Sequence, residues 1–220
     1  EGVELKAHTV FKIGGRARYF CEARTVEELR EAIEFARAKK LPFFILGAGS
    51  NVLISDRGFD GLAIKMEVSA LAVRGQTVEV GAGVPMARIV AEAVKAGLTG
   101  FEWAIGIPGT IGGSVRGNAG CFGGETKDVV YSVQFFDAET AHRGVFSRSE
   151  CGFGYRDSIF KRKPQWVITS VMLELKPGGV AESQARIREY SDKRRMTQDI
   201  GSQCAGCMFK NVLWGGVDKS

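Results

Sequence analysis

The sequence lacks the features of a membrane protein, a secreted protein or a histidine-based metal protein. No run approaches the roughly 18 consecutive apolar residues of a membrane-spanning helix, and we expect no membrane association. The first residues contain no basic segment followed by an apolar one, so no secretory signal is expected. The 220 residues include two histidines, His8 and His142, which stand far apart. A metal site built from paired histidines is therefore not expected.

The charge pattern does not favour a nucleic-acid-binding protein. Lys and Arg total 30 against 25 Asp and Glu, a net charge of +5. The basic residues are scattered, with short clusters at Lys161–Lys163 and Lys193–Arg195. Neither a recognition helix nor an array of stacking aromatic residues accompanies them. We predict no nucleic-acid partner, whereas the modest positive excess suits small anionic molecules.

The cysteines predict free thiols rather than a disulfide framework. There are five, an odd number, and they are spread through the chain. This usage is typical of a cytoplasmic protein. Cys204 and Cys207 form a C-x-x-C motif, but zinc would require a second pair of ligands and a redox motif would require a thioredoxin-like unit. Taken alone, the motif is interpreted as two unrelated thiols.

Hydrophobic patterning predicts a mixed α+β protein of one or two small domains. Thr25 and Glu28 form a capping box that begins a helix. No internal repeat or low-complexity segment occurs. The expected helices are 25–40, 85–96 and 181–195. The expected strands are 43–46, 52–54, 62–66, 77–80, 129–136, 145–146 and 166–175.

Glycine is the most over-represented residue, with 29 among 220 positions, nearly double the average share of about 7%. Gly47-x-Gly49 follows an expected strand and resembles the start of the dinucleotide fingerprint G-x-G-x-x-G. The third glycine position is Val52, and no helix is expected there, so a Rossmann domain is disfavoured. The loop remains either an anion-binding loop with bare backbone N–H groups or a simple tight turn.

A second segment, Gly106–Gly120, contains six glycines in fifteen residues. Each ordered glycine loses extra conformational entropy on folding, so such a density needs a reason. Ile107, Ile111 and Val115 argue against a flexible linker. The segment predicts a backbone that approaches a ligand closely or takes positive φ, and a flat ligand with phosphates fits it best.

Five motifs, taken together, resemble the UDP-N-acetylenolpyruvoylglucosamine reductase family, flavoenzymes of bacterial peptidoglycan synthesis. They occur in the family's order and are Thr9–Gly15, Leu46–Leu53, Gly106–Gly120, Phe153–Phe160 and Ala205–Asn211. The resemblance implies the two-subdomain FAD-binding fold of the vanillyl-alcohol oxidase type. The start of a substrate-binding α+β subdomain would follow. The expected boundaries are 1–67, 68–176 and 177–220, and the spacing of Arg156 and Cys207 resembles the family's short form.

The resemblance also implies which residues bind the cofactor. The FAD pyrophosphate and flavin would contact the two glycine-rich segments. The expected cofactor-binding residues are Leu46, Gly47, Ala48, Gly49, Ser50, Asn51, Val52, Leu53, Ile107, Pro108, Gly109, Thr110, Gly112, Gly113, Ser114, Asn118, Ala119 and Gly120.

The implied reaction passes reducing equivalents from NADPH through tightly bound FAD to the enolpyruvyl ether of a UDP-sugar, giving UDP-N-acetylmuramate. Arg156 matches the family's catalytic arginine, whose planar fork suits the substrate carboxylate as negative charge develops. Tyr155, Lys210 and Asn211 would also bind substrate. Cys207 stands where the family has a serine that donates a proton. A thiol is a stronger acid than an alcohol, so Cys207 can take that role.

One expected residue does not appear. The family has a catalytic glutamate near its C-terminus, whereas Glu174, Glu182 and Glu189 all precede the proton-donor motif. The sequence is therefore expected to be a fragment or to lack residues. The alternatives are a flavin-binding but catalytically incomplete protein, or another oxidoreductase of the same flavin fold. We expect a monomer that acts on a small molecule in the cytoplasm.

Overall fold

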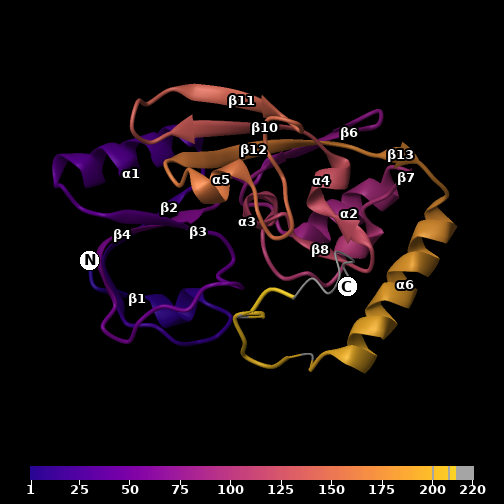
Figure 1. Cartoon of the computed structure of the whole chain (residues 1–220), viewed down its shortest axis with the longest axis horizontal. Helices are drawn as coiled ribbons and strands as arrows, with labels where there is room; N and C mark the ends of the chain where they lie inside the picture. The colour runs from indigo at the N-terminus through magenta and orange to yellow at the C-terminus, as the bar shows by residue number, and fades with distance from the viewer. Residues whose placement is uncertain (200, 208, 212–220) are drawn as a thin grey trace.

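A computed structural model describes residues 1–199, 201–207 and 209–211. Two β-sheets organise the chain (Figure 1). The first sheet has the order β1-β2-β4-β3, and all of its pairs except β1 with β2 are parallel. Its strands are β1 (Val3–Glu4), β2 (Arg16–Ala23), β3 (Phe43–Leu46) and β4 (Phe59–Met66). Met208 of the fifth motif and residues 212–220 of the expected substrate-binding subdomain lie outside the described residues.

The second sheet has the order β11-β10-β12-β6-β5 and is antiparallel throughout. Its strands are β5 (Leu71–Arg74), β6 (Thr77–Gly81), β10 (Val130–Asp137), β11 (Arg143–Ser147) and β12 (Trp166–Glu174). Two short ribbons pair β7 (Leu98–Thr99) with β13 (Lys176–Pro177) and β8 (Gly120–Cys121) with β9 (Gly124–Glu125). The mixed α+β class is therefore confirmed, whereas the subdomain boundaries remain a prediction.

The helices fill the space between and beside the sheets. They are α1 (Val26–Ala38), α2 (Met86–Lys95), α3 (Ile111–Gly117), α4 (Thr126–Val129), α5 (Ile159–Arg162) and α6 (Val180–Thr197), with short 3₁₀ turns η1 (Leu5–His8) and η2 (Glu102–Ala104). One continuous core cluster takes side chains from α1, α2, α3 and strands of both sheets. In the described residues, none of these helices is long and apolar enough to cross a membrane.

Helix α1 begins where the sequence predicts, because the Thr25 side chain accepts a hydrogen bond from the Glu28 N–H at 3.0 Å. The predicted capping box is incomplete, since the Glu28 carboxylate accepts from the Arg24 N–H at 2.6 Å and not from Thr25. Its buried residues pack toward β2 and β4. Arg143 of β11 forms an ion pair with Glu27 of α1 at 2.7 Å. Helix α1 therefore contacts both sheets, as Figure 1 shows.

The strand predicted over 52–54 is wrong, because the chain there is irregular. Ile54 packs into the small cluster around Leu5, whereas the neighbouring Leu53 is 65% exposed. The three residues lie between the loop that follows β3 and the turn that precedes β4, and they pair with neither strand. Ile54 thus owes its burial to local packing rather than to a place in the sheet.

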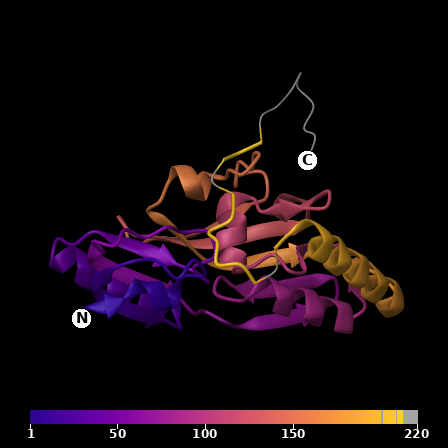
Figure 2. The same ribbon diagram turned by 90° about the horizontal axis from the view of Figure 1, so that it is seen from below.

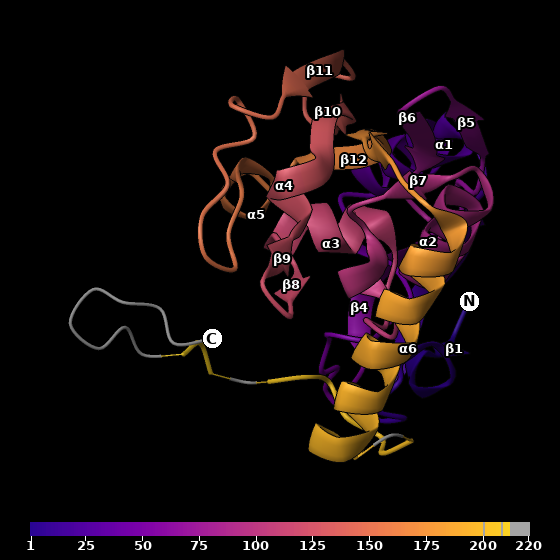
Figure 3. The same cartoon turned by 90° about the vertical axis from the view of Figure 1, so that its right-hand side faces the viewer.

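Helix α6 leaves the second sheet and packs against η2 and α2 (Figure 3). Glu102 anchors it: the buried carboxylate accepts hydrogen bonds from Ser183 Oγ at 2.5 Å, Thr99 Oγ1 at 2.6 Å and the Gly100 N–H at 2.8 Å. Burial alone would raise the pKa of Glu102, but the bonds from Ser183 and Thr99 outweigh it and lower the pKa. After α6 the chain returns toward the glycine-rich loops (Figure 2).

Candidate active site

The two glycine-rich loops, far apart in sequence, meet in the fold. Ser50 Oγ donates to the Pro108 carbonyl at 2.9 Å across 58 positions. A Cβ added at Gly47 would lie 2.8 Å from Thr110 Oγ1. The backbone at Gly47 therefore packs against the Thr110 side chain, and the absence of a side chain at Gly47 is what allows it.

The first motif, Thr9–Gly15, supports the loop at Gly49. The backbone N–H of Val10 donates to the Gly49 carbonyl at 3.0 Å. Gly49 has φ of +68°, and a Cβ there would lie 2.1 Å from the His8 carbonyl oxygen. Glycine is therefore required at this position by both conformation and space.

The meeting loops offer a cradle that fits a phosphate group. Ala48 and Gly113 are exposed, so only small residues cover the surface there. The backbone N–H groups of Ala48, Gly49 and Ser50 donate to no acceptor within the described residues. Unpaired N–H groups in a loop that contains a left-handed residue are the donors that bind anions in proteins. This observation favours the anion-binding alternative over a simple tight turn.

The second loop contains a helix that the sequence did not indicate. Gly106 and Gly109 have φ of +73° and +134°, as the glycine density predicts, but α3 begins at Ile111. A Cβ at Gly112 would lie 3.0 Å from the Ala82 Cβ, so this glycine allows α3 to pack closely beside β6. The close approach at Gly112 is therefore to Ala82 of the protein and not to a ligand.

Asn118, predicted to bind the cofactor, has a fully buried side chain that is satisfied by the protein. It ends α3 in the left-handed conformation, with φ of +43°. Its Nδ2 donates to the Gly154 carbonyl at 2.9 Å and to Glu125 Oε2 at 3.1 Å, and its Oδ1 accepts from the Lys127 N–H at 3.0 Å. These bonds tie the second loop to the Phe153–Phe160 motif.

Arg156 stands at the tip of a tight turn. The turn is closed by two backbone hydrogen bonds between Gly154 and Asp157, at 3.0 and 3.2 Å. Arg156 has φ of +54°, a conformation that side-chain-bearing residues rarely adopt and that concentrates at functional sites. Its Nη2 donates to the Gly120 carbonyl at 3.1 Å, and its guanidinium lies 5.3 Å from the centre of the Tyr155 ring. The cation is thus positioned by Gly120 of the third motif and by Tyr155 of its own motif.

The fifth motif closes the arrangement. Asn51 Nδ2 donates to the Ala205 carbonyl at 2.8 Å, across 154 positions. Lys210 Nζ lies 3.5 Å from the Tyr155 carbonyl, and the Asn211 N–H lies 3.4 Å from the Tyr155 hydroxyl. Cys207, between these contacts, is exposed. The structure therefore brings the segment that carries Cys207 to the Gly47–Asn51 loop and to the turn that carries Arg156.

The remaining predicted cofactor residues differ in accessibility. Leu46 is buried at the end of β3, and Thr110 and Ser114 are also buried. Partly exposed positions are Val52, Ile107, Gly112, Ala119 and Gly120, and Pro108 is exposed. The cofactor roles of all these residues remain proposals.

Sequence reasoning missed Arg194, which packs against this region from α6. It belongs to the basic cluster Lys193–Arg195, which alone resembles a solvated surface. The buried face of α6 follows Ser183, Ile187, Tyr190 and Arg194, a helical spacing of four, three and four. That periodicity was the available signal, although it is hidden by the polar composition of the helix.

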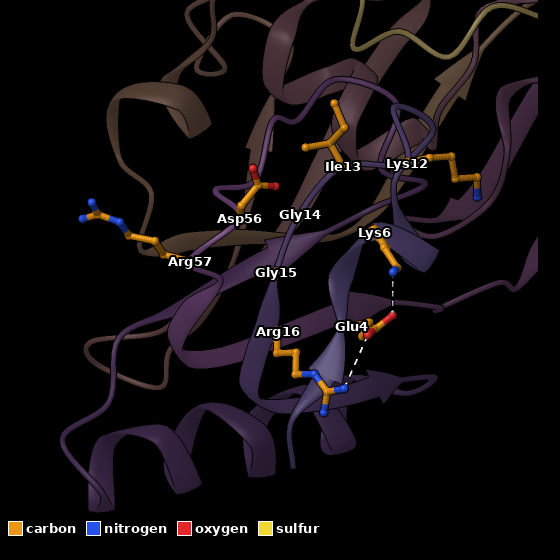
Figure 4. A pocket seen from close by; sticks show the side chains of 9 residues that line it. All are labelled: Glu4, Lys6, Lys12, Ile13, Gly14, Gly15, Arg16, Asp56 and Arg57. Atoms are coloured by element: carbon orange, nitrogen blue, oxygen red, sulfur yellow. Dashed lines mark hydrogen bonds and ion pairs between the residues drawn. The ribbon is translucent and has the colours of Figure 1, made fainter.

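A separate pocket of about 540 Å³ lies at the N-terminal edge of the first sheet (Figure 4). Glu4 pairs there with Lys6 at 3.1 Å and with Arg16 at 3.4 Å. Its lining residues are Glu4, Lys6, Lys12, Ile13, Gly14, Gly15, Arg16, Asp56 and Arg57. None of them is a predicted cofactor, substrate or catalytic residue. The pocket thus takes part of its lining from the first motif, at Lys12–Gly15, and none from the two glycine-rich loops or from the turn that carries Arg156.

The thiols differ in accessibility, and Cys21 and Cys121 are partly exposed. Cys204 and Cys207 are exposed, whereas Cys151 is buried, and burial raises the pKa of its thiol to about 12. All five cysteines are free. Within the described ranges, no group of three or more His, Cys, Asp or Glu residues is arranged to hold a metal ion.

The fold and the meeting loops define a flavin-binding protein of the vanillyl-alcohol oxidase type. The FAD binding domain family matches residues 17–142, which include both glycine-rich loops. The structure also resembles 6-hydroxy-D-nicotine oxidase from Arthrobacter nicotinovorans with a TM-score of 0.54 and 20% identity, over 72% of this chain and 36% of that one. This distant likeness concerns the fold.

Two closer relatives identify the family. UDP-N-acetylenolpyruvoylglucosamine reductase from Carboxydothermus hydrogenoformans is 39% identical over 96% of this chain and 70% of its own length. The crystal structure of the reductase from Thermus caldophilus has a TM-score of 0.82 and 36% identity, covering 96% of this chain and 74% of that one. The chain belongs to the UDP-N-acetylenolpyruvoylglucosamine reductase family.

Proposed function

We propose that this protein is the NADPH-dependent FAD enzyme that reduces UDP-N-acetylglucosamine enolpyruvate to UDP-N-acetylmuramate for peptidoglycan synthesis. Membership of the family supports this function. The observation that carries it is the meeting of five motifs, drawn from residues 9 to 211, around one surface. A fold retained without the activity would have no need to keep all five together.

The cofactor would lie against the two glycine-rich loops. FAD, when bound, supplies hydride-transfer chemistry between the nicotinamide and the enolpyruvyl group. The free N–H groups of Ala48, Gly49 and Ser50 suit the pyrophosphate, because backbone donors bind its charge without a bulky side chain. The bare surface at Gly113 leaves room for a flat ring system.

Arg156 would bind the carboxylate of the enolpyruvyl group. As the double bond is reduced, negative charge spreads onto that carboxylate. A fixed guanidinium stabilises the more charged transition state more than the ground state. The turn at Gly154–Asp157 and the bond to Gly120 hold the guanidinium in place. Tyr155, Lys210 and Asn211 would bind the remaining anionic and polar groups of the substrate.

Cys207 would complete the reaction by donating the Sγ proton to the carbon next to the carboxylate. Its segment is anchored at Ala205 by Asn51 and at Asn211 by Tyr155, the residue that precedes Arg156, and these contacts support the role. The thiol replaces the serine of the family with a stronger acid. Cys204 has no role in this proposal.

We further propose that the enzyme works as a cytoplasmic monomer on free small molecules, with neither nucleic acid nor membrane as a partner. Its three parts would be 1–67 and 68–176 for the flavin and 177–220 for the start of the substrate-binding subdomain. The +5 net charge suits a substrate with a diphosphate and a carboxylate.

Anaerobic half-reaction kinetics test this function. Purified protein should be yellow, NADPH should bleach the visible absorbance of the oxidised flavin, and UDP-N-acetylglucosamine enolpyruvate should restore it. Bleaching without recolouring would identify a flavin protein that cannot complete the second half of the reaction. A preparation that does not bind FAD would contradict the proposal.

A further inference from the structure

Arg194 on α6 is a buried cation without a matching anion. Its residue is 7% exposed, and it forms no ion pair with a carboxylate of the described residues. Its neighbours Lys193 and Arg195 do pair, with Glu189 at 2.6 Å and Asp192 at 3.3 Å. A buried charge is costly unless it is paired and hydrogen-bonded. The protein therefore maintains a charge that an anion can compensate.

The guanidinium is nevertheless held firmly. Its Nε donates to the Ile105 carbonyl at 2.9 Å, and its Nη1 donates to Gln198 Oε1 at 3.1 Å. Its central carbon lies 5.2 Å from the centre of the Phe122 ring, on the β8–β9 hairpin. Phe122 is in turn stacked on Tyr190, one turn earlier in α6. Three separate elements thus fix the orientation of the side chain.

One nitrogen of this group remains without a partner. Arg194 Nη2 is buried and is the one such side-chain donor found unbonded in the described part of the chain. Buried polar groups in native proteins almost always have partners, so an exception needs an explanation such as an ion or ligand. An oriented, unpaired guanidinium N–H is well suited to a charged oxygen acceptor.

The location indicates which molecules could supply that oxygen. A Cβ at Gly106 would lie 2.8 Å from Arg194 Cδ, so the side chain packs directly against the start of the second glycine-rich loop. The β8–β9 hairpin beneath Phe122 also carries Gly120, whose carbonyl accepts the bond from Arg156. Arg194 therefore borders the same surface as the proposed cofactor and substrate residues.

We propose that Arg194 is a ligand-binding residue whose Nη2 donates to a negatively charged oxygen of a molecule bound against the Gly106–Gly120 loop. This inference rests on the proposed function, which supplies two sources of such an oxygen, the FAD cofactor and the enolpyruvyl UDP-sugar. Helix α6 lies outside the matched FAD binding domain. Arg194 would thus link the third part of the chain to the flavin-binding part.

The test compares Arg194→Gln and Arg194→Lys with a matched control, Arg195→Gln. Arg195 is the next residue on the same helix and is exposed. Each protein is stripped of flavin, and its dissociation constant for FAD is measured by quenching of flavin fluorescence. The KM for UDP-N-acetylglucosamine enolpyruvate is measured on the reloaded enzymes, and the melting temperature is measured on the stripped ones.

We expect both Arg194 variants to weaken one of the two affinities at least tenfold, while Arg195→Gln stays within twofold of the parent. A rise in the FAD dissociation constant assigns the oxygen to the cofactor, and a rise in KM alone assigns it to the substrate. Folded Arg194 variants with both constants unchanged overturn the inference, even if their melting temperature falls.

Arg194→Lys keeps the positive charge and the aliphatic stem. If Arg194→Gln does not fold, the FAD dissociation constant and the KM of Arg194→Lys test the inference. The parent protein serves as the reference for the underlying function. A parent that fails to bind FAD contradicts the proposed function itself, whereas a normal parent with normal Arg194 variants contradicts this inference alone.

Discussion

Asn51 donates a hydrogen bond from its side chain to the backbone carbonyl of Ala205, at 2.8 Å and across 154 positions of sequence. Gly206, the next residue, has φ of +78°, and a Cβ there would lie 2.9 Å from Asn51 Nδ2. The segment that carries Cys207 is therefore fastened to the loop proposed to bind the flavin pyrophosphate.

Replacement of Cys207 separates the two halves of the reaction. We expect Cys207→Ala to leave flavin reduction by NADPH at the parental rate and to slow reoxidation by the enolpyruvyl substrate at least about a hundredfold, the usual size of a general-acid contribution. Cys207→Ser restores a proton donor and should retain much of the activity. Stopped-flow absorbance measures both steps. Cys204→Ala is the control, and parental reoxidation by Cys207→Ala would show the assignment to be wrong.

Gly49 and Gly75 allow the cost of a left-handed backbone conformation to be measured separately from the cost of a steric clash. Gly49 and Gly75 have φ of +68° and +61°, but a Cβ meets the His8 carbonyl at 2.1 Å in the first case and nothing within 4 Å in the second. Gly75→Ala should cost about 1–2 kcal/mol of unfolding free energy, the penalty of a left-handed alanine. Gly49→Ala should cost clearly more and lower flavin content. Urea unfolding and flavin absorbance test this, and equal costs would contradict it.

Arg156 should show a stability difference that is independent of catalysis. Alanine and glycine both remove the guanidinium, but only glycine accepts φ of +54° without strain. We therefore expect Arg156→Gly to be about 1 kcal/mol more stable than Arg156→Ala, the reverse of the order in a helix. Both should lose substrate reduction and keep flavin reduction. If the alanine variant is the more stable one, the turn in solution differs from the one described.

Glu102 should make the docking of α6 dependent on pH. Hydrogen bonds from Ser183 and Thr99 lower its pKa below the ordinary 4.5, despite burial. The stabilisation is thus present above about pH 4.5 and is lost as the pH falls through the lower folded value. Glu102→Gln should cost about 1 kcal/mol at pH 7 and much less near pH 3. Unfolding curves at both pH values measure it, and a constant difference would contradict it.

Local patterns predicted the elements whose signals do not depend on distant residues. The cap at Thr25, the apolar strand 43–46 and the helix that ends before Gly97 all occur near their expected positions. Strand β2 (Arg16–Ala23) was missed, because the alternation of Arg16–Arg18 gives way to the continuous run Tyr19–Cys21, whose side chains are partly buried on both faces. Helix α3 was missed because three of its seven residues are glycine.

The sequence predicted some parts of the candidate site and missed others. The glycine-rich loops were recognisable, because positive φ and close approach exclude most other residues. The partners of those glycines could not be read from the sequence. Gly47 meets Thr110, Gly49 meets His8 and Gly112 meets Ala82. Likewise, Asn118 looks like a loop residue in sequence, whereas in the fold it is a buried connector between two motifs.

The long range of the site's contacts bears on how the protein folds. Ser50 and Pro108 are 58 positions apart, Gly120 and Arg156 are 36 apart, and Asn51 and Ala205 are 154 apart. Contacts that close such large loops are entropically expensive and form late. A cradle that exists only after these contacts have formed cannot help to nucleate folding. We therefore expect bound flavin to stabilise the finished protein by slowing its unfolding and to leave the rate of folding nearly unchanged.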